Sequence, residues 1–179
     1  MQRPLDAALY QPWQLHWRDD RPPPRVLDLL LLDCSASMVQ SGALALAKGL
    51  GIALMDEAYR ARRDVGLIRF GGQHAGVEVW PQQSGWFNGD WVEPLTGGGG
   101  TPLQAAVDLA QAVVQQARPA VCCLWLLSDG RVHERPAAPQ GCDVIHVLDV
   151  DQAPPHRRLP GARLLAEHWQ ARYLALPAA

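Results

Sequence analysis

Residues 26–37 read VLDLLLLDCSAS, and this stretch decides the fold. Residues 26–32 are aliphatic except for Asp28, as expected of a strand that helices cover on both faces. The aliphatic run ends in Asp33, Ser35 and Ser37, which alternate with small residues. Because ligands of parallel sheets lie beyond the carboxyl ends of the strands, the stretch predicts a central parallel strand with a polar site at its end.

Strand and helix patterns alternate along the rest of the chain. Apolar residues at helical spacing predict one helix over about residues 39–62 and another that begins at Thr101-Pro102 and runs to Ala117. A short helix is expected over 161–169, and strands over 65–70, 76–80, 120–127, 143–150 and 173–176; Pro81 is predicted to end the second of these, a half-exposed edge strand. The alternation predicts an α/β fold: a doubly wound, Rossmann-like domain whose mostly parallel central sheet is flanked by helices and has one antiparallel edge strand.

Composition limits the class of protein. The chain has 179 residues, of which 48% are hydrophobic and 19% charged, and its formal net charge is −2. These values exclude a wholly disordered chain and give no reason to expect nucleic acid as a partner. The sequence holds no apolar run of about 18 residues, so we expect no membrane span, and no apolar segment of a secretory signal. Four cysteines without framework spacing fit a reduced, cytoplasmic protein.

Prolines divide the chain into two parts. Pro4, Pro12 and the run at residues 22–24 favour an extended arm over residues 1–25. Residues 26–179 are then expected to form one α/β domain.

Oxygen-bearing side chains recur at three strand or helix ends. Asp33, Ser35 and Ser37 follow the first strand, Thr101 follows four glycines at residues 97–100, and Asp129 follows the strand over 120–127. Carboxylates and hydroxyls are ligands that Mg²⁺ prefers, and Mn²⁺ can substitute for it. If Ser35, Ser37 and Thr101 bind directly, one coordination position remains for a carboxylate from outside. The pattern therefore predicts an ion-bridged docking site for an acidic side chain of a partner.

This order of residues resembles the metal-ion-dependent adhesion site of von Willebrand factor type A domains. Further segments are similar to the C-terminal domain of the D-type component of magnesium chelatase: Pro12-Trp13-Gln14, Lys48-Gly49, Ala58-Tyr59-Arg60, Arg63-Asp64, Gly98-Gly99-Gly100-Thr101-Pro102-Leu103, Leu127-Ser128-Asp129-Gly130-Arg131, Leu165-Ala166-Glu167 and Ala171-Arg172-Tyr173-Leu174. The likeness covers nearly the whole chain.

The resemblance implies a function. It implies a non-catalytic subunit of an ATP-dependent complex that inserts magnesium or cobalt into a tetrapyrrole of chlorophyll or cobalamin biosynthesis. Its partners would be an AAA+ ATPase subunit, a large tetrapyrrole-binding subunit, or both. The AAA+-like domain and the acidic linker that precede this domain in full-length D-type chelatase components have no counterpart in the sequence, so the motor is expected to be a separate chain.

Other functions remain open on the sequence alone. Asp33 could be the nucleophile of a Mg²⁺-dependent phosphotransferase, although the second acid expected two residues on is Ser35 here. The domain could also be a generic adhesion or scaffold module, or one that keeps the motif without binding metal. The glycines at residues 97–100 lack the lysine of a phosphate-binding loop, which argues against nucleotide binding.

Several further residues have two interpretations. Trp86, Phe87 and Trp91 either plug the end of the sheet or form a partner-binding patch beside the ion. Arg131 either orients an incoming carboxylate or satisfies a loop carbonyl. Cys122 and Cys123 should point to opposite faces of their strand and belong to the core. The six histidines are interpreted as structural or solvent-facing: His16, His74, His133, His146, His156 and His168.

Overall fold

The computed structural model describes residues 24–83 and 97–176, so nearly all of the predicted N-terminal arm lies outside it. Within these residues, six strands form one sheet in the order β3-β2-β1-β4-β5-β6. Only β2 and β3 pair antiparallel; the other neighbours are parallel. The strands are β1 (Val26–Asp33), β2 (Asp64–Gly71), β3 (His74–Gln83), β4 (Val121–Ser128), β5 (Val144–Asp149) and β6 (Arg172–Ala175). The predicted fold class is confirmed.

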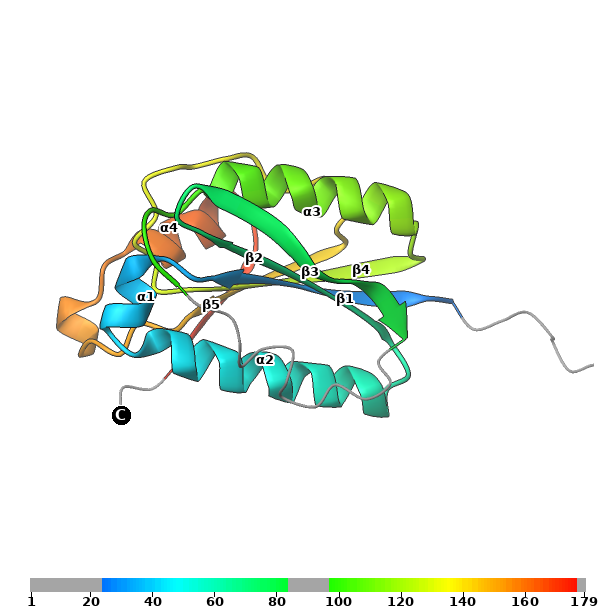
Figure 1. Ribbon diagram of the computed structural model, residues 1–179, viewed down its shortest axis with the longest axis horizontal. Coiled ribbons are helices and arrows are strands. Elements are labelled where there is room, and N and C mark those ends of the chain that lie inside the picture. The colour runs from blue at the N-terminus through cyan, green and yellow to red at the C-terminus, as the bar shows by residue number, and fades with distance from the viewer. Residues whose placement is uncertain (1–23, 84–96, 177–179) are drawn as a thin grey trace, which may run out of the picture.

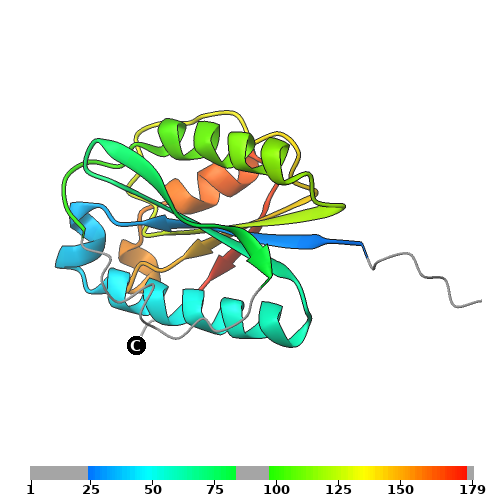
Figure 2. The same ribbon diagram turned by 45° about the vertical axis from the view of Figure 1, so that its right-hand side comes forward.

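Helices cover both faces of the sheet. They are α1 (Ala36–Gln40), α2 (Ala43–Arg60), α3 (Leu103–Ala117) and α4 (Gly161–His168), with a 3₁₀ turn at Pro155–Arg157. Figure 1 shows α3 and α4 on one face and α2 on the other, and the turned view in Figure 2 shows the same three layers. The short α1 lies at the end of the sheet where β1 finishes, which is the edge that carries the polar motif.

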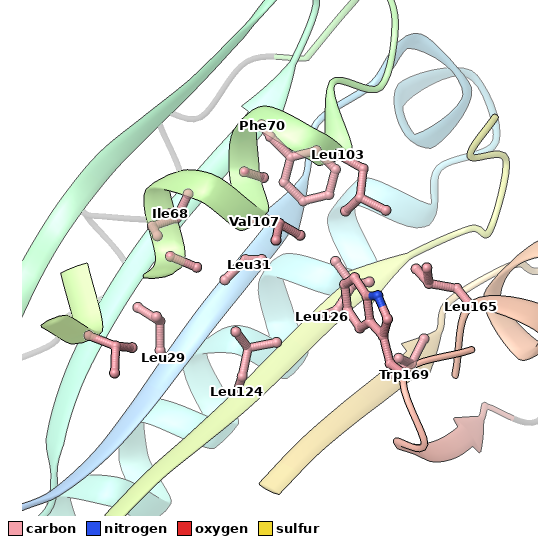
Figure 3. Close-up of a cluster of buried hydrophobic side chains, with 14 of the residues drawn as sticks. Leu29, Leu31, Ile68, Phe70, Leu103, Val107, Leu124, Leu126, Leu165 and Trp169 are labelled. Atoms are coloured by element: carbon pink, nitrogen blue, oxygen red, sulfur yellow. The ribbon is translucent and has the colours of Figure 1, made fainter. Parts of the chain in front are cut away.

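Strand β1 separates two apolar layers. Leu29 and Leu31 point to the face covered by α3 and α4 and belong to the apolar layer that also contains Phe70 and Trp169 (Figure 3). Leu30 and Leu32 belong to the other layer, with residues of α2. Every residue of β1 after Val26 is buried. Burying aliphatic side chains on both faces is worth roughly 1.5–3 kcal/mol for each of them, so β1 is the element around which the sheet is packed.

The prediction of one helix over residues 39–62 is wrong in two respects: the helical segment begins earlier, and it is interrupted. The chain forms α1 directly after Ser35, then breaks at Gly42, whose φ is 77°, and begins α2 at Ala43. Ser41 holds the break: its hydroxyl donates to the carbonyl of Ser37 at 2.8 Å and accepts from the amide of Ala43 at 3.3 Å. Glycine suits the left-handed conformation because it has no Cβ. The early start places Ser37 in the first turn of a helix.

The prediction that Pro81 ends the edge strand is also wrong, because β3 continues to Gln83. Val65 pairs with Gln82 and Leu67 with Val79, so the register shifts opposite Pro81. A bulge on an edge strand is one of the few places in a sheet that accept proline, which has no N–H to donate.

Asp28 interrupts the aliphatic run of β1 and is 2% exposed. Nη1 of Arg63 lies 3.1 Å from its Oδ2, and the indole Nε1 of Trp125 donates to its Oδ1 at 3.0 Å. A buried carboxylate is costly without such partners. Asp28 therefore holds together β1, β4 and the start of β2, far from the polar end of the sheet.

We expect opposite effects from two glycine substitutions. A Cβ on Gly71, the last residue of β2, would lie 2.6 Å from the carbonyl oxygen of Cys34, whereas one on Gly49, on the exposed side of α2, meets nothing within 4 Å. Gly71→Ala should lower the free energy of unfolding by about 1–3 kcal/mol through overpacking. Gly49→Ala should raise it by about 0.5–1 kcal/mol because alanine is the better helix former. Urea denaturation measures both, and equal stability of the two variants would contradict the packing described.

Candidate metal centre

The carboxyl edge of the sheet gathers three segments that are distant in sequence. Asp33 ends β1, Ser35 and Ser37 follow in the turn and the start of α1, and Asp129 directly follows β4. The glycine loop before α3 is hydrogen-bonded to the first turn: the amide of Gly98 donates to the carbonyl of Cys34 at 2.9 Å, and the amide of Ala36 donates to the carbonyl of Gly99 at 3.1 Å. These backbone bonds hold the segment that bears Thr101 against the serine turn.

Asp33 is fully buried and both its oxygens are hydrogen-bonded. Oδ1 accepts from the amide of Ser35 at 2.9 Å, and Oδ2 accepts from the hydroxyl of Ser128 at 2.6 Å. Burial raises the pKa of the Asp33 carboxyl; the hydrogen bonds to Ser128 and Ser35 act in the opposite direction. The negative charge of Asp129 raises the same pKa further, so the two carboxylates are close enough to repel.

The two serine hydroxyls face each other. Oγ of Ser35 lies 3.2 Å from Oγ of Ser37, and Ser35 is 2% exposed. Ser35 is the N-cap of α1, yet its side chain makes no capping hydrogen bond. Its hydroxyl is therefore directed away from the helix amides that it could satisfy, which leaves oxygen lone pairs for another ligand.

Asp129 is the least satisfied group of the site. It is 1% exposed, and its Oδ1 accepts from the amide of Arg131 at 3.1 Å. Its Oδ2 is buried and has no hydrogen-bond donor within the described residues; Nε of Arg131 approaches it at 3.5 Å. A buried carboxylate oxygen without a donor is what a cation would satisfy.

Thr101 is half-buried and lies two residues before α3. The loop that follows Asp129 returns to this helix, where Oε2 of Glu134 accepts from the amide of Gln104 at 2.6 Å. An acidic group is favourable at a helix N-terminus because of the exposed N–H groups and the helix dipole. Glu134 thus links the loop after Asp129 to the start of the helix that follows Thr101.

The donor set fits a hard cation. It contains two carboxylates and three hydroxyls, the chemistry that suits Mg²⁺. Among residues 24–83 and 97–176 no group of three or more His, Cys, Asp or Glu side chains could hold a metal ion, so a site rich in such ligands is not an alternative in this part of the chain. Burial raises the pKa of the Cys34 thiol to about 11, and Cys34 packs into the core, so it supplies no thiolate.

Sequence reasoning missed Ser128 and Glu134. Ser128 is one residue before Asp129, and its side chain points to the same face of the sheet as that of Asp33 because β1 and β4 are parallel neighbours. Strand alternation would have placed Ser128 there had the register been known. No local signal marks Glu134, which acts on a helix 30 residues away in sequence.

Arg131 contacts the carboxylate of Asp129, an arrangement that neither interpretation of the sequence included. Trp86, Phe87 and Trp91 lie outside the described residues.

The prediction for the histidines agrees with the structure where it describes them, and that for the cysteines agrees in part. Cys122 is in the core, and its Sγ lies 3.7 Å from that of Cys142, both as free thiols. Cys123 is only half-buried and belongs to neither apolar layer. His146 is buried and stacks on Trp125 with ring centroids 4.0 Å apart. The four other histidines in the described part of the chain are exposed: His74, His133, His156 and His168.

Comparisons with known proteins bear on the family and the fold of this chain. A family model for the von Willebrand factor type A domain matches residues 29–131. The magnesium-chelatase 60 kDa subunit of Rhodobacter capsulatus is 32% identical over 171 residues, which cover 87% of this chain and 30% of that subunit. The corresponding subunit of Cereibacter sphaeroides is 38% identical over 112 residues, covering 60% of this chain and 19% of the subunit. This chain therefore spans less than a third of the length of these two relatives.

Among solved structures, the PilB minor pilin of Streptococcus sanguinis superposes with a TM-score of 0.67 at 10% identity, over 88% of this chain and 59% of the pilin. At that identity the likeness supports the fold alone. Within the described residues, no helix has the length and apolar character needed to cross a membrane.

Ser128→Ala tests the link between β4 and the turn that carries Asp33, Ser35 and Ser37. The Ser128 hydroxyl donates to Asp33 and accepts from the amide of Gly130 at 3.1 Å. Removing it leaves buried groups unpaired, so the free energy of unfolding should fall by about 1–3 kcal/mol. Ser41→Ala is the matched control, because this exposed serine also makes two hydrogen bonds, and water can replace them. Chemical denaturation should show the larger loss for Ser128→Ala; a loss no greater than that of the control would contradict the role given to this hydroxyl.

Proposed function

Because the chain belongs to the von Willebrand factor type A domain family, we propose that it is a binding subunit whose adhesion site docks an acidic side chain of a partner through a bound Mg²⁺. The ligands would be Asp33, Ser35, Ser37, Thr101 and Asp129, bound either directly or through water. The protein would be cytoplasmic, with residues 1–25 as an extended arm and residues 26–179 as the binding domain.

One observation carries the proposal: a buried oxygen of Asp129 has no hydrogen-bond donor in the described part of the chain, and it belongs to a site whose second carboxylate, Asp33, is also buried. Two buried carboxylates that repel each other are costly in a metal-free protein. A dication would neutralise both and would replace the missing partner of Asp129. The bound ion would supply an electrophilic centre for one carboxylate from outside the chain.

The chain's own residues would orient that ion. The amide of Ser35 and the hydroxyl of Ser128 fix the Asp33 carboxylate. The amide of Arg131 fixes that of Asp129, so its free oxygen has a defined direction. The three hydroxyl ligands carry no charge, so the two carboxylates would balance the charge of the dication without exceeding it. The ion would therefore keep its affinity for an anionic ligand from a partner.

The likeness to magnesium-chelatase 60 kDa subunits supports a place in a chelatase complex. We propose an AAA+ ATPase chelatase subunit and a large tetrapyrrole-binding subunit as the partners. The chain itself would be non-catalytic, coupling these subunits during insertion of magnesium or cobalt into the tetrapyrrole. A generic adhesion or scaffold role would use the same site with a different acidic partner.

A phosphotransferase with Asp33 as nucleophile fits the geometry poorly. Asp33 has no exposed surface. A nucleophile has to approach the reacting atom of its substrate directly, which a carboxylate without exposed surface does not do. Turnover of a phosphate ester that Asp33→Asn abolishes would favour that function over docking.

Asp129→Asn tests the ion site. This nearly isosteric change removes one of the two charges, so calorimetric titration should show Mg²⁺ affinity reduced by at least about tenfold, with the circular dichroism spectrum unchanged. Asp108→Asn is the matched control, because this exposed carboxylate on α3 accepts a hydrogen bond from the side chain of Gln104 and belongs to no ion site. Equal Mg²⁺ affinity in the wild-type protein and both variants would overturn the site.

A capture experiment tests the partner. The purified AAA+ and large chelatase subunits should bind the wild-type chain in Mg²⁺ and not in EDTA. Ser35→Ala combined with Asp129→Ala should abolish that binding in Mg²⁺. Normal capture of the double variant in EDTA would contradict docking through a bound ion.

A further inference from the structure

The loop after β4 places a cation against the carboxylate that the metal site leaves unsatisfied. Nε of Arg131 lies 3.5 Å from Oδ2 of Asp129, and the amide of the same arginine donates to Oδ1 at 3.1 Å. The two side chains differ sharply in exposure: 47% for Arg131 and 1% for Asp129. A half-exposed guanidinium therefore lies beside a buried carboxylate oxygen.

This contact neutralises charge without making a hydrogen bond. At 3.5 Å the Nε–Oδ2 distance exceeds that of a normal N–H···O bond, and Oδ2 has no other donor among the described residues. A half-exposed arginine can rotate into water at little cost, since its charge stays hydrated there. The backbone bond to Oδ1 does not depend on the side chain and would keep Asp129 in place after such a rotation.

We propose that Arg131 is a placeholder cation, which neutralises Asp129 in the metal-free protein and is displaced toward solvent when a divalent cation enters. The inference rests on the proposed function, because it requires the ion site. It assigns Arg131 a positioning role: its positive charge opposes the incoming ion, so it sets how much Mg²⁺ is needed to fill the site. Removing the charge of Arg131 should therefore raise Mg²⁺ affinity, whereas removing a ligand lowers it.

Two readouts follow from this competition. Arg131→Gln leaves Asp129 without a cation, so the variant should melt at a lower temperature than wild type in EDTA and gain more from saturating Mg²⁺. Calorimetric titration with Mg²⁺ alone should show affinity about three- to tenfold tighter than wild type, since a repulsive charge has been removed. The difference in affinity should shrink at high salt, because part of the charge is exposed to solvent.

Two further variants separate charge from structure. Arg131→Lys keeps the positive charge, so its Mg²⁺ affinity should stay close to that of wild type. Arg163→Gln is the matched control, because Arg163 pairs with Glu167 at 3.1 Å on the exposed surface of α4. Its loss should change neither the Mg²⁺ affinity nor the melting shift.

The outcomes distinguish this inference from the proposed function. Unchanged or weaker Mg²⁺ binding by Arg131→Gln, with normal binding by wild type, overturns the placeholder role and leaves the ion site standing. Loss of fold in Arg131→Gln that saturating Mg²⁺ does not restore assigns Arg131 to structure and also overturns it. A wild-type protein that binds no Mg²⁺ overturns both.

Discussion

The hydrogen bond from the hydroxyl of Ser128 to Oδ2 of Asp33, 2.6 Å long, joins the carboxyl ends of the two central strands. It exists because β1 and β4 are parallel neighbours in a register that pairs Leu32 with Leu127. A slip by one residue would turn Asp28 and Asp33 to the other face of the sheet, away from Trp125 and Ser128, so the buried aspartates favour this register. The polar end of the sheet is thus positioned by the pairing of the two central strands.

The two buried aspartates of β1, Asp28 and Asp33, differ in the partners that surround them. Asp28 has Arg63 and the indole of Trp125 as partners, both supplied by the fold. Asp33 accepts hydrogen bonds from an amide and a hydroxyl, and the charged neighbour that it meets in the site is a second carboxylate. Asp28 is compensated by the guanidinium of Arg63 at 3.1 Å. In the proposed site, the half-exposed Arg131 approaches one of two buried carboxylates at 3.5 Å, and the net negative charge that remains favours a cation from solution.

The loop after β4 carries both charged groups of the site and a contact to α3. It begins with Asp129, continues with Arg131 against that carboxylate, and reaches the first turn of α3 through Glu134. A short segment therefore connects the charge of the site, its counter-charge and the helix that follows Thr101. In the proposed site, the backbone bond that holds Asp129 is separate from the exposed guanidinium of Arg131, so a change at the guanidinium leaves that bond in place.

The sequence by itself determined the class of fold, the central strand at residues 26–33, the helix after Thr101 and a candidate ligand set, because periodicity and strand-end polarity are local properties of the chain. The break at Gly42 and the contact of Arg131 with Asp129 involve neighbouring residues that the periodicity of the sequence did not single out. The sequence also did not determine the passage of β3 through Pro81 or the roles of Ser128 and Glu134. These depend on partners up to 95 residues apart in sequence, as with Ser128 and Asp33. Only the tertiary structure decides them, because register and packing, rather than neighbouring residues, set which buried polar atoms meet and which are left for a ligand.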